Sequence, residues 1–141
     1  MRLALRFCVT LLLVVGSWAA RAADIPDAAR AEIKSVIERQ LAAFARDDAA
    51  AAFGLASPGI QRQFGSADTF MAMVRSDYRA VYRPRSISFG ALERIEDNLV
   101  QIVDLIGPGG ESVRALYIME RDGDAWRING VSLVPGTEKE T

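Results

Sequence analysis

The sequence predicts an α+β domain in which N-terminal helices pack on a curved, four-stranded antiparallel sheet, giving a cone-like shape. Apolar residues recur at intervals of three and four over about residues 33–78, which is typical of amphipathic helices. After Pro84, short apolar or alternating runs lie between turn residues, which is typical of strands. Because the helical segments precede the strands, the order favours α+β over repeated β-α-β units.

Composition indicates one folded domain and excludes several kinds of chemistry. The chain has 141 residues, of which 50% are apolar and 25% charged, as in globular rather than disordered proteins. A net charge of -1 gives no indication of a nucleic-acid partner. The sequence contains no histidine, which excludes a histidine general base, a Ser-His-Asp triad and imidazole metal ligands.

Residues 1–22 have the features of a signal peptide. Arg2 and Arg6 precede an apolar run over residues 7–20, which is shorter than the roughly 20 residues that a membrane-spanning helix needs. Ala20 and Ala22 are suitable small residues for cleavage after Ala22. We expect an exported protein, periplasmic or secreted, with a mature domain over 23–141 and no stable membrane insertion. The alternative is an uncleaved membrane anchor.

Cleavage there would also remove Cys8, the single cysteine. The mature chain would have no disulfide, no thiol nucleophile and no thiolate metal ligand. The remaining acidic clusters, Asp47–Asp48 and Asp122–Asp124, are expected in turns and lack the spacing of a calcium loop. We therefore expect neither a metal nor a cofactor.

The helices are expected to begin at residues that can cap them and to end where the backbone cannot continue. The expected caps are Asp24, Asp47–Asp48, Ser57 and Ser66. Gly65 is expected to end one segment, and Pro84 ends the helical half of the chain. The first helix buries an apolar stripe from Ile33 to Phe44, and a short helix is expected over 49–55.

The expected strands include Ser86–Phe89, Leu99–Ile106, Val113–Glu120 and Ala125–Val134. Turn residues separate them at 96–98, 107–110 and 122–123, and the tail 135–141 is expected to be disordered. Asn129–Gly130 is expected to form a bulge that bends the last strand.

The two middle strands are apolar on both faces. One face must pack on the helices, and the other must meet a second subunit, a fold-back of the curled sheet or a ligand. We favour a homodimer.

Five segments of the mature chain carry a family resemblance. They are Gln40–Phe44, Phe53–Pro58, Phe70–Val74, Val81–Pro84 and Trp126–Gly130. Over about residues 30–134 they resemble the bacterial family catalogued as domain of unknown function 4864. The order of helices and strands also resembles the nuclear-transport-factor-2-like superfamily, a cystatin-like cone. That resemblance implies a pocket between the long helix and the sheet, used for isomerase, cyclase, dehydratase or purely binding functions. It implies no catalytic residue in this chain.

The candidate pocket residues are Tyr78, Tyr82, Asp104, Tyr117, Met119 and Trp126. A buried tyrosine can donate a hydrogen bond to a developing enolate or a ligand carbonyl, but a core aromatic with its hydroxyl at the surface is the alternative. Trp126 is expected to plug the cone rather than to stack on a ligand. Met71, Met73 and Met119 could form an adaptable apolar lining or a plain core.

Asp104 is the lone acid in an otherwise apolar strand. Desolvation would raise its pKa, as a general base requires. The alternative is an outward-facing acid paired with an arginine.

Arg75, Arg79 and Arg83 recur every four residues, with Arg85 just beyond. On a continuous helix they would form a cationic stripe able to hold a carboxylate or phosphate, with Arg79, Arg83 and Arg85 as the anion-binding candidates. The alternative is that these cations only favour the dipole at a helix C-terminus.

The function expected from these observations is non-catalytic binding of a small apolar ligand or a protein partner through the pocket and sheet face. The alternative is a small isomerase or dehydratase that uses a carboxylate base and a tyrosine donor. A dimeric scaffold is a third hypothesis. We favour binding, because no carboxylate and tyrosine are placed convincingly as a catalytic pair.

Overall fold

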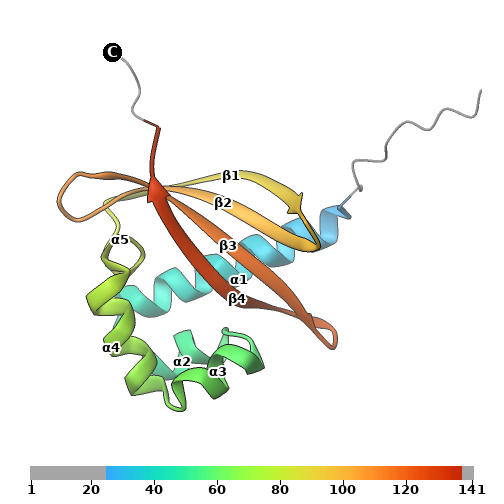
Figure 1. The fold of residues 1–141 in the computed structure, drawn as a ribbon, viewed down its shortest axis with the longest axis horizontal. Helices are drawn as coiled ribbons and strands as arrows, with labels where there is room; N and C mark the ends of the chain where they lie inside the picture. Colours follow the sequence, from blue (N-terminus) through green and yellow to red (C-terminus); the bar gives the residue numbers. More distant parts are fainter. Residues whose placement is uncertain (1–24, 138–141) are drawn as a thin grey trace, which may run out of the picture.

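The computed structural model describes residues 25–137, in which helices precede a four-stranded sheet (Figure 1). The predicted α+β class is confirmed. The expected signal peptide, its cleavage site and the expected cap Asp24 lie outside the described residues. The helices are α1 (Asp27–Ala45), α2 (Ala49–Gly54), α3 (Pro58–Phe64), α4 (Ala67–Asp77) and α5 (Arg79–Tyr82). The strands are β1 (Ser86–Ile95), β2 (Asn98–Ile106), β3 (Ser112–Asp122) and β4 (Ala125–Pro135).

Side-chain caps set the starts of three helices, as the sequence predicts. Asp48, Ser57 and Ser66 accept hydrogen bonds from the backbone N–H groups of Ala51, Ile60 and Thr69, at 3.0, 3.2 and 3.2 Å. Each bond satisfies an amide that the first helical turn leaves unpaired. Gly65 ends α3 with φ 77°, a left-handed conformation that suits glycine.

The continuous helix that an arginine stripe would require through Arg83 is not present. Tyr78 leaves the helical conformation, with φ -128° and ψ 46°, and separates α4 from the single turn α5. The break turns the chain so that Ala80 and Val81 are buried in the core before Pro84 ends the helical half.

The strands form an antiparallel meander in the order β1-β2-β3-β4. The predicted turns are confirmed, and Glu96, Gly110 and Gly123 occupy them with positive φ. Strand β4 continues to Pro135, and the N–H of Gly136 donates to the carbonyl of Ser112 at 3.0 Å. The disorder expected over 135–141 therefore does not hold for Pro135 and Gly136.

Bulges interrupt both edge strands. The pairing of β1 with β2 shifts between Phe89 and Leu92, and the buried Gln101 donates through Nε2 to the carbonyls of Gly90 and Ala91 at 2.9 and 3.3 Å. In β4 the register shifts opposite Ile118 and Met119, so that Asn129 is the extra residue. The bulge predicted at Asn129–Gly130 is confirmed, and both shifts increase the curvature of the sheet.

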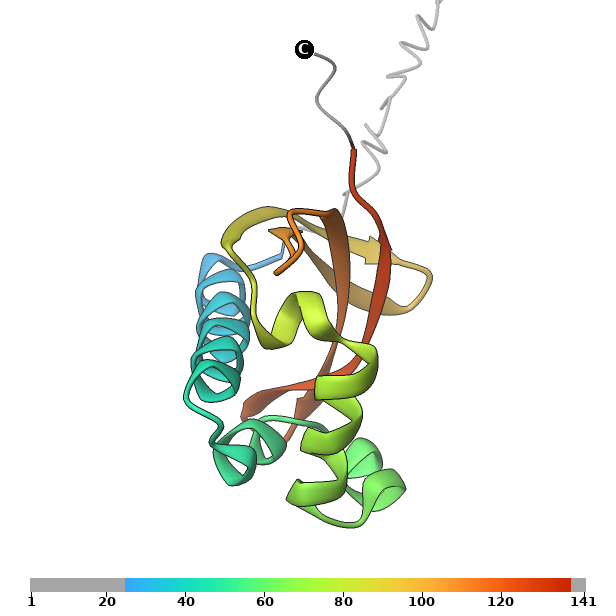
Figure 2. The same ribbon diagram turned by 90° about the vertical axis from the view of Figure 1, so that its left-hand side faces the viewer.

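The middle strands have two apolar faces, as predicted. The inner face carries the buried side chains Leu99, Val103, Leu105, Ala115, Tyr117 and Met119. Helix α1 lies across this face (Figure 1), and α4 and α5 close one end of the space between α1 and the sheet (Figure 2). The outer face carries Val100, Ile102, Leu116 and Ile118, of which Val100 is buried.

The turn between α2 and α3 is joined to the middle of β4. The N–H of Ser57 donates to the carbonyl of Ile128 at 2.8 Å, and the N–H of Ile128 donates to the carbonyl of Leu55 at 3.0 Å. The buried Ser57 hydroxyl also donates to Oδ1 of the bulge residue Asn129 at 2.7 Å. These bonds fix the position of α3 relative to the sheet. Within residues 25–137, no helix has the length and apolar character needed to span a membrane.

Candidate functional site

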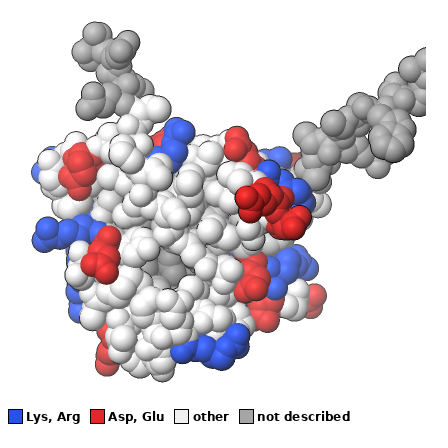
Figure 3. Space-filling model, viewed as in Figure 1, with Lys and Arg blue, Asp and Glu red and all other residues white. Residues whose placement is uncertain are grey.

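A pocket with a volume of about 370 Å³ lies between the end of α1, helices α3 and α4, and strand β4. Its opening is visible in Figure 3 as a hollow where β4 passes α4, on a face whose centre is uncharged. The apolar lining consists of Phe44, Ala56, Ile60, Phe64, Phe70, Met73, Val74, Val81, Ile118, Ile128, Gly130 and Val131. The polar lining consists of Gln40, Gln63, Asp77, Tyr78 and Ser132.

Phe70 organises the aromatic wall of this pocket. Its ring centroid lies 6.2 Å from that of Phe44, 5.5 Å from that of Phe53 and 5.7 Å from that of Phe64. Phe70 is buried, so these contacts hold α1, α2, α3 and α4 around one side chain. Tilted and edge-on aromatic pairs at such separations are favourable and directional, and they give the wall a defined shape.

The polar residues of the lining differ in how deeply they are buried. Gln40 is buried, and its Nε2 donates to the carbonyl of Ala52 at 3.2 Å. Asp77, Gln63 and Ser132 are exposed and Tyr78 is half-buried, so these four lie toward the opening. Asp77 is the charged residue of the lining. The pocket therefore has an apolar interior and a polar rim with one carboxylate and three groups that can both donate and accept hydrogen bonds.

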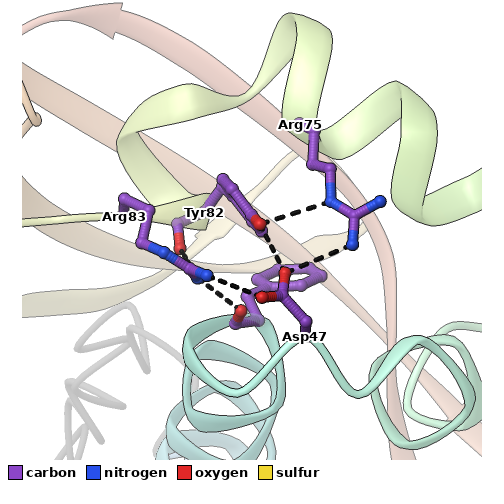
Figure 4. A network of polar contacts seen from close by, with 5 residues as sticks. Asp47, Arg75, Tyr82 and Arg83 are labelled. Carbon is purple, nitrogen blue, oxygen red and sulfur yellow. Dashed lines mark hydrogen bonds and ion pairs between the residues drawn. The ribbon is translucent and has the colours of Figure 1, made fainter.

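A second candidate site is built around Asp47, just after α1. One carboxylate oxygen, Oδ1, accepts from Nη2 of Arg75 at 3.2 Å, and the other, Oδ2, accepts from Nη2 of Arg83 at 2.9 Å. The Tyr82 hydroxyl also donates to Oδ1 of Asp47, and Arg75 donates to that hydroxyl through Nε at 3.3 Å (Figure 4). The guanidinium of Arg83 lies 4.1 Å from the centroid of the Tyr82 ring.

Asp47 occupies a backbone position that normally takes glycine. Its φ is 55°, in the left-handed region. The N–H of Asp48 donates to the carbonyl of Ala43 at 2.9 Å and that of Asp47 to the carbonyl of Phe44 at 3.1 Å, which is the Schellman arrangement for ending a helix. A left-handed aspartate is disfavoured relative to glycine, so the contacts of its carboxylate must stabilise it here.

The charges around Asp47 support each other. The hydrogen bond from Tyr82, and then the bond and charge of Arg75, lower the pKa of Asp47. The same contacts raise the pKa of Arg75. Beside this network lies a cleft of about 430 Å³, which we call the arginine cleft, lined by Arg75, Arg79, Tyr82, Arg83, Pro108 and Gly109.

A family profile described as "Domain of unknown function (DUF4864)" matches residues 26–141. The chain belongs to this family. The match runs from the residue before α1 through β4, so the pocket and the arginine cleft both lie within the DUF4864 domain. Comparison with curated proteins and with solved structures gives no match.

Only some of the pocket residues predicted from the sequence line the pocket of the DUF4864 domain. Tyr78 and Met73 line the pocket, whereas Tyr82 lines the arginine cleft. Tyr117 and Met119 are buried on the inner face of the sheet and do not line the pocket. Burial raises the pKa of the Tyr117 phenol, and its hydroxyl has no hydrogen-bond partner among the described residues.

Trp126 is half-buried at the start of β4, away from the pocket lining. The centroid of its ring lies 5.2 Å from the Arg121 guanidinium, and its backbone N–H donates to Oε1 of Glu32 at 3.4 Å. Its buried indole N–H has no hydrogen-bond partner among the described residues. Trp126 thus covers the part of the DUF4864 domain where β4 meets α1.

Asp104 does not line the pocket, and it lacks the raised pKa that a general base would require. It lies on the outer face of the sheet, where Arg114 donates through Nε and Nη2 to its two oxygens at 2.8 and 3.2 Å. These bonds lower the pKa of Asp104. The structure shows the alternative of an outward acid paired with an arginine.

The arginine pattern is only partly retained. Arg75, Arg79 and Arg83 still line one cleft although the helix breaks at Tyr78, whereas Arg85 does not line it. The sequence predicts Asp47 only as a cap or turn acid, and no sequence pattern points to Arg75, Tyr82 and Arg83 as its partners. Among residues 25–137, no group of three acidic side chains gathers where it could hold a metal ion.

Proposed function

We propose that this DUF4864 domain binds a small, mostly apolar molecule in the pocket and does not transform it chemically. The observation that carries this proposal is the pocket itself, with a volume of about 370 Å³, an aromatic interior and a few polar groups at the rim. Sites for small molecules usually have this volume and this division between apolar walls and a few orienting polar groups.

The rim favours one class of ligand. Asp77 supplies a negative charge, and Gln63, Tyr78 and Ser132 supply oxygen atoms that can accept hydrogen bonds. A carboxylate headgroup would meet the like charge of Asp77. We therefore propose a ligand with an apolar body and a neutral or cationic group that donates hydrogen bonds, such as a hydroxyl or an amine.

An isomerase or dehydratase function is the second candidate. Asp77 and Tyr78 supply a carboxylate and a phenol in the pocket lining, which are the groups such a reaction would use. Binding is better supported, because Asp77 is exposed at the rim, whereas the walls of the pocket are apolar. Both functions use the same cavity, and a reaction additionally requires the Asp77 carboxylate.

The neutral fluorescent probe N-phenyl-1-naphthylamine tests the pocket. The wild-type protein is expected to enhance its fluorescence in a saturable way. Met73→Trp would fill the cavity from α4 and is expected to weaken probe binding at least about tenfold. Ala72→Trp places the same side chain on the exposed side of α4 and is the matched control. Equal binding by both variants, or no saturable enhancement by the wild type, would overturn the proposal.

We also propose that two copies associate through the outer face of the sheet. This face carries Ile102, Leu116 and Ile118, and its charges at Asp104 and Arg114 already neutralise each other. Light scattering of the purified protein is expected to give the mass of a dimer. Leu116→Glu is expected to produce monomers, and Ala72→Glu on α4 should not. A wild-type monomer at high concentration would contradict this part of the proposal.

Export is the third part of the proposal, and it rests on the pattern of residues 1–22. Mass spectrometry of the protein purified from its native cells is expected to show a chain that begins at Ala23. A chain that retains Arg2 and Arg6 would contradict export with cleavage. We further propose membership in the nuclear-transport-factor-2-like superfamily, supported by a long helix and a curved sheet that flank a pocket.

A further inference from the structure

We propose that the arginine cleft binds a dianionic phosphate group, with Arg79 as its main ligand. The cleft lies between the α4–α5 segment and the β2–β3 loop, and its volume is about 430 Å³. It does not share its lining with the apolar pocket, so this inference is independent of the function proposed for the pocket.

Donors are available in the cleft. Arg79 is exposed and lines the cleft, and its guanidinium takes part in none of the hydrogen bonds or ion pairs formed among the described residues. Arg75 uses Nε for Tyr82 and Nη2 for Asp47, which leaves its Nη1 group free within the described part of the chain. A guanidinium fork matches the oxygen geometry of phosphate, so Arg79 can bind it in a bidentate manner while Arg75 adds a third or fourth bond.

The charges of the cleft match a dianion. Arg75, Arg79 and Arg83 contribute three positive charges and Asp47 one negative charge, which leaves two positive charges uncompensated. Arginine remains protonated at any physiological pH, and Asp47 remains ionised because its contacts lower its pKa. A phosphate monoester carries about two negative charges near neutral pH.

The network around Asp47 also prepares the cleft before a ligand arrives. Arg83 donates through Nη1 to the carbonyl of Phe44 at 2.6 Å, and its guanidinium packs on the Tyr82 ring. Arg75 is held by Asp47 and Tyr82. Long side chains lose conformational entropy when a ligand orders them, so arginines that are already ordered bind with less loss. Asp47 is therefore a positioning residue that holds two arginines at the cleft.

Calorimetric titration of the purified protein with inorganic phosphate at low ionic strength tests the proposal. Saturable binding is expected, and Arg79→Ala is expected to weaken it at least about tenfold. Arg39→Ala removes an exposed arginine of α1 that does not line the cleft, and it should leave the affinity unchanged. Sulfate is expected to bind comparably and acetate at least about tenfold more weakly, because acetate carries one charge.

Two further probes distinguish free from lipid-bound phosphate. These are glycerol 3-phosphate and phosphatidylcholine vesicles that contain phosphatidic acid. If glycerol 3-phosphate or the vesicles bind in a way that depends on Arg79, the result supports the proposal and shows whether the phosphate group is free or lipid-bound. The proposal would be overturned if Arg79→Ala kept the wild-type affinity for phosphate, or if Arg39→Ala lost as much affinity as Arg79→Ala. It would also be overturned if acetate bound as tightly as phosphate, or if the wild type showed no saturable binding. Unchanged circular dichroism and melting temperature of Arg79→Ala would show that a loss is not caused by unfolding. Met73→Trp should not alter phosphate affinity, so failure of one site does not imply failure of the other.

Discussion

The pocket and the arginine cleft lie on two faces of the same segment, α4 and α5, and they differ in how they are built. Phe70, Val74 and Val81 line the pocket, while Arg75 and Arg79 line the cleft. The pocket wall is continuous with the hydrophobic core, so its residues contribute to both folding and binding. The cleft is lined mainly by exposed side chains, and its half-buried members are Tyr82 and Arg83. Substitutions should therefore affect stability at the pocket and mainly affinity at the cleft.

The largest effect is expected for Phe70→Ala. Removing this buried ring, which contacts three other aromatic rings, should lower the free energy of unfolding by about 3–5 kcal/mol. Arg79→Ala should change it by no more than about 0.5 kcal/mol, since an exposed side chain is removed. Urea denaturation of both variants measures the difference. Equal losses would contradict the distinction between pocket and cleft.

A smaller loss is expected at the turn that supports the pocket. Ser57→Ala removes a helix cap and the bond to Asn129 from a buried site, and should lower the free energy of unfolding by about 2 kcal/mol. Ser66→Ala removes an exposed cap, and about 1 kcal/mol or less is expected. A larger loss for Ser66→Ala would show that the link between Ser57 and β4 contributes little.

Tyr117→Phe should stabilise the protein. The Tyr117 hydroxyl is buried without a hydrogen-bond partner among the described residues, so its removal relieves a desolvation penalty and raises the free energy of unfolding by roughly 1 kcal/mol. Thermal denaturation of the variant should show a higher melting temperature. A clear decrease would indicate that the hydroxyl has a partner.

The smallest effect concerns the response of the cleft to pH. The folded pKa of Asp47 is lowered, so its contribution to stability is present above the unfolded pKa of about 3.9 and is lost as the pH falls through the folded value. Asp47→Asn keeps a residue that tolerates positive φ and should be slightly less stable than wild type at pH about 7. The two proteins should converge at a pH below the folded pKa of Asp47.

Melting curves at both pH values measure this difference. The loss caused by Phe70→Ala should be the same at both, because that ring contacts apolar side chains. A difference for Asp47→Asn that persists at low pH would mean that its carboxylate contributes nothing through its charge.

The parts of the fold that are determined by residues close together in the sequence can be predicted from it. The caps Asp48, Ser57 and Ser66 act on amides three residues away, so the helix starts follow from local chemistry. Turn residues likewise predict the strand order and the bulge at Asn129. The break at Tyr78 is not predicted, because burial of Ala80 and Val81 against other elements determines it.

The candidate sites depend on contacts between distant residues, which limits their prediction. Asp47 lies 28, 35 and 36 residues from Arg75, Tyr82 and Arg83, and no local pattern joins them. Asp104 could be assigned to a strand, but its pairing with Arg114 depends on strand register. The residues of the pocket wall could be predicted as the apolar sides of helices, but periodicity does not distinguish a filled core from a cavity.

The link between the α2–α3 turn and β4 also affects how the protein behaves at high concentration. An edge strand presents unpaired amides and carbonyls to which another chain can add, and β4 is such an edge. The turn occupies the middle of that edge at Ile128, and the bulge at Asn129 bends the strand next to it. Together they interrupt the β4 edge between Ile128 and Gly130, so another strand cannot pair along its whole length. The short connection between α2 and α3 thereby makes the β4 edge of the sheet less open to pairing with another chain.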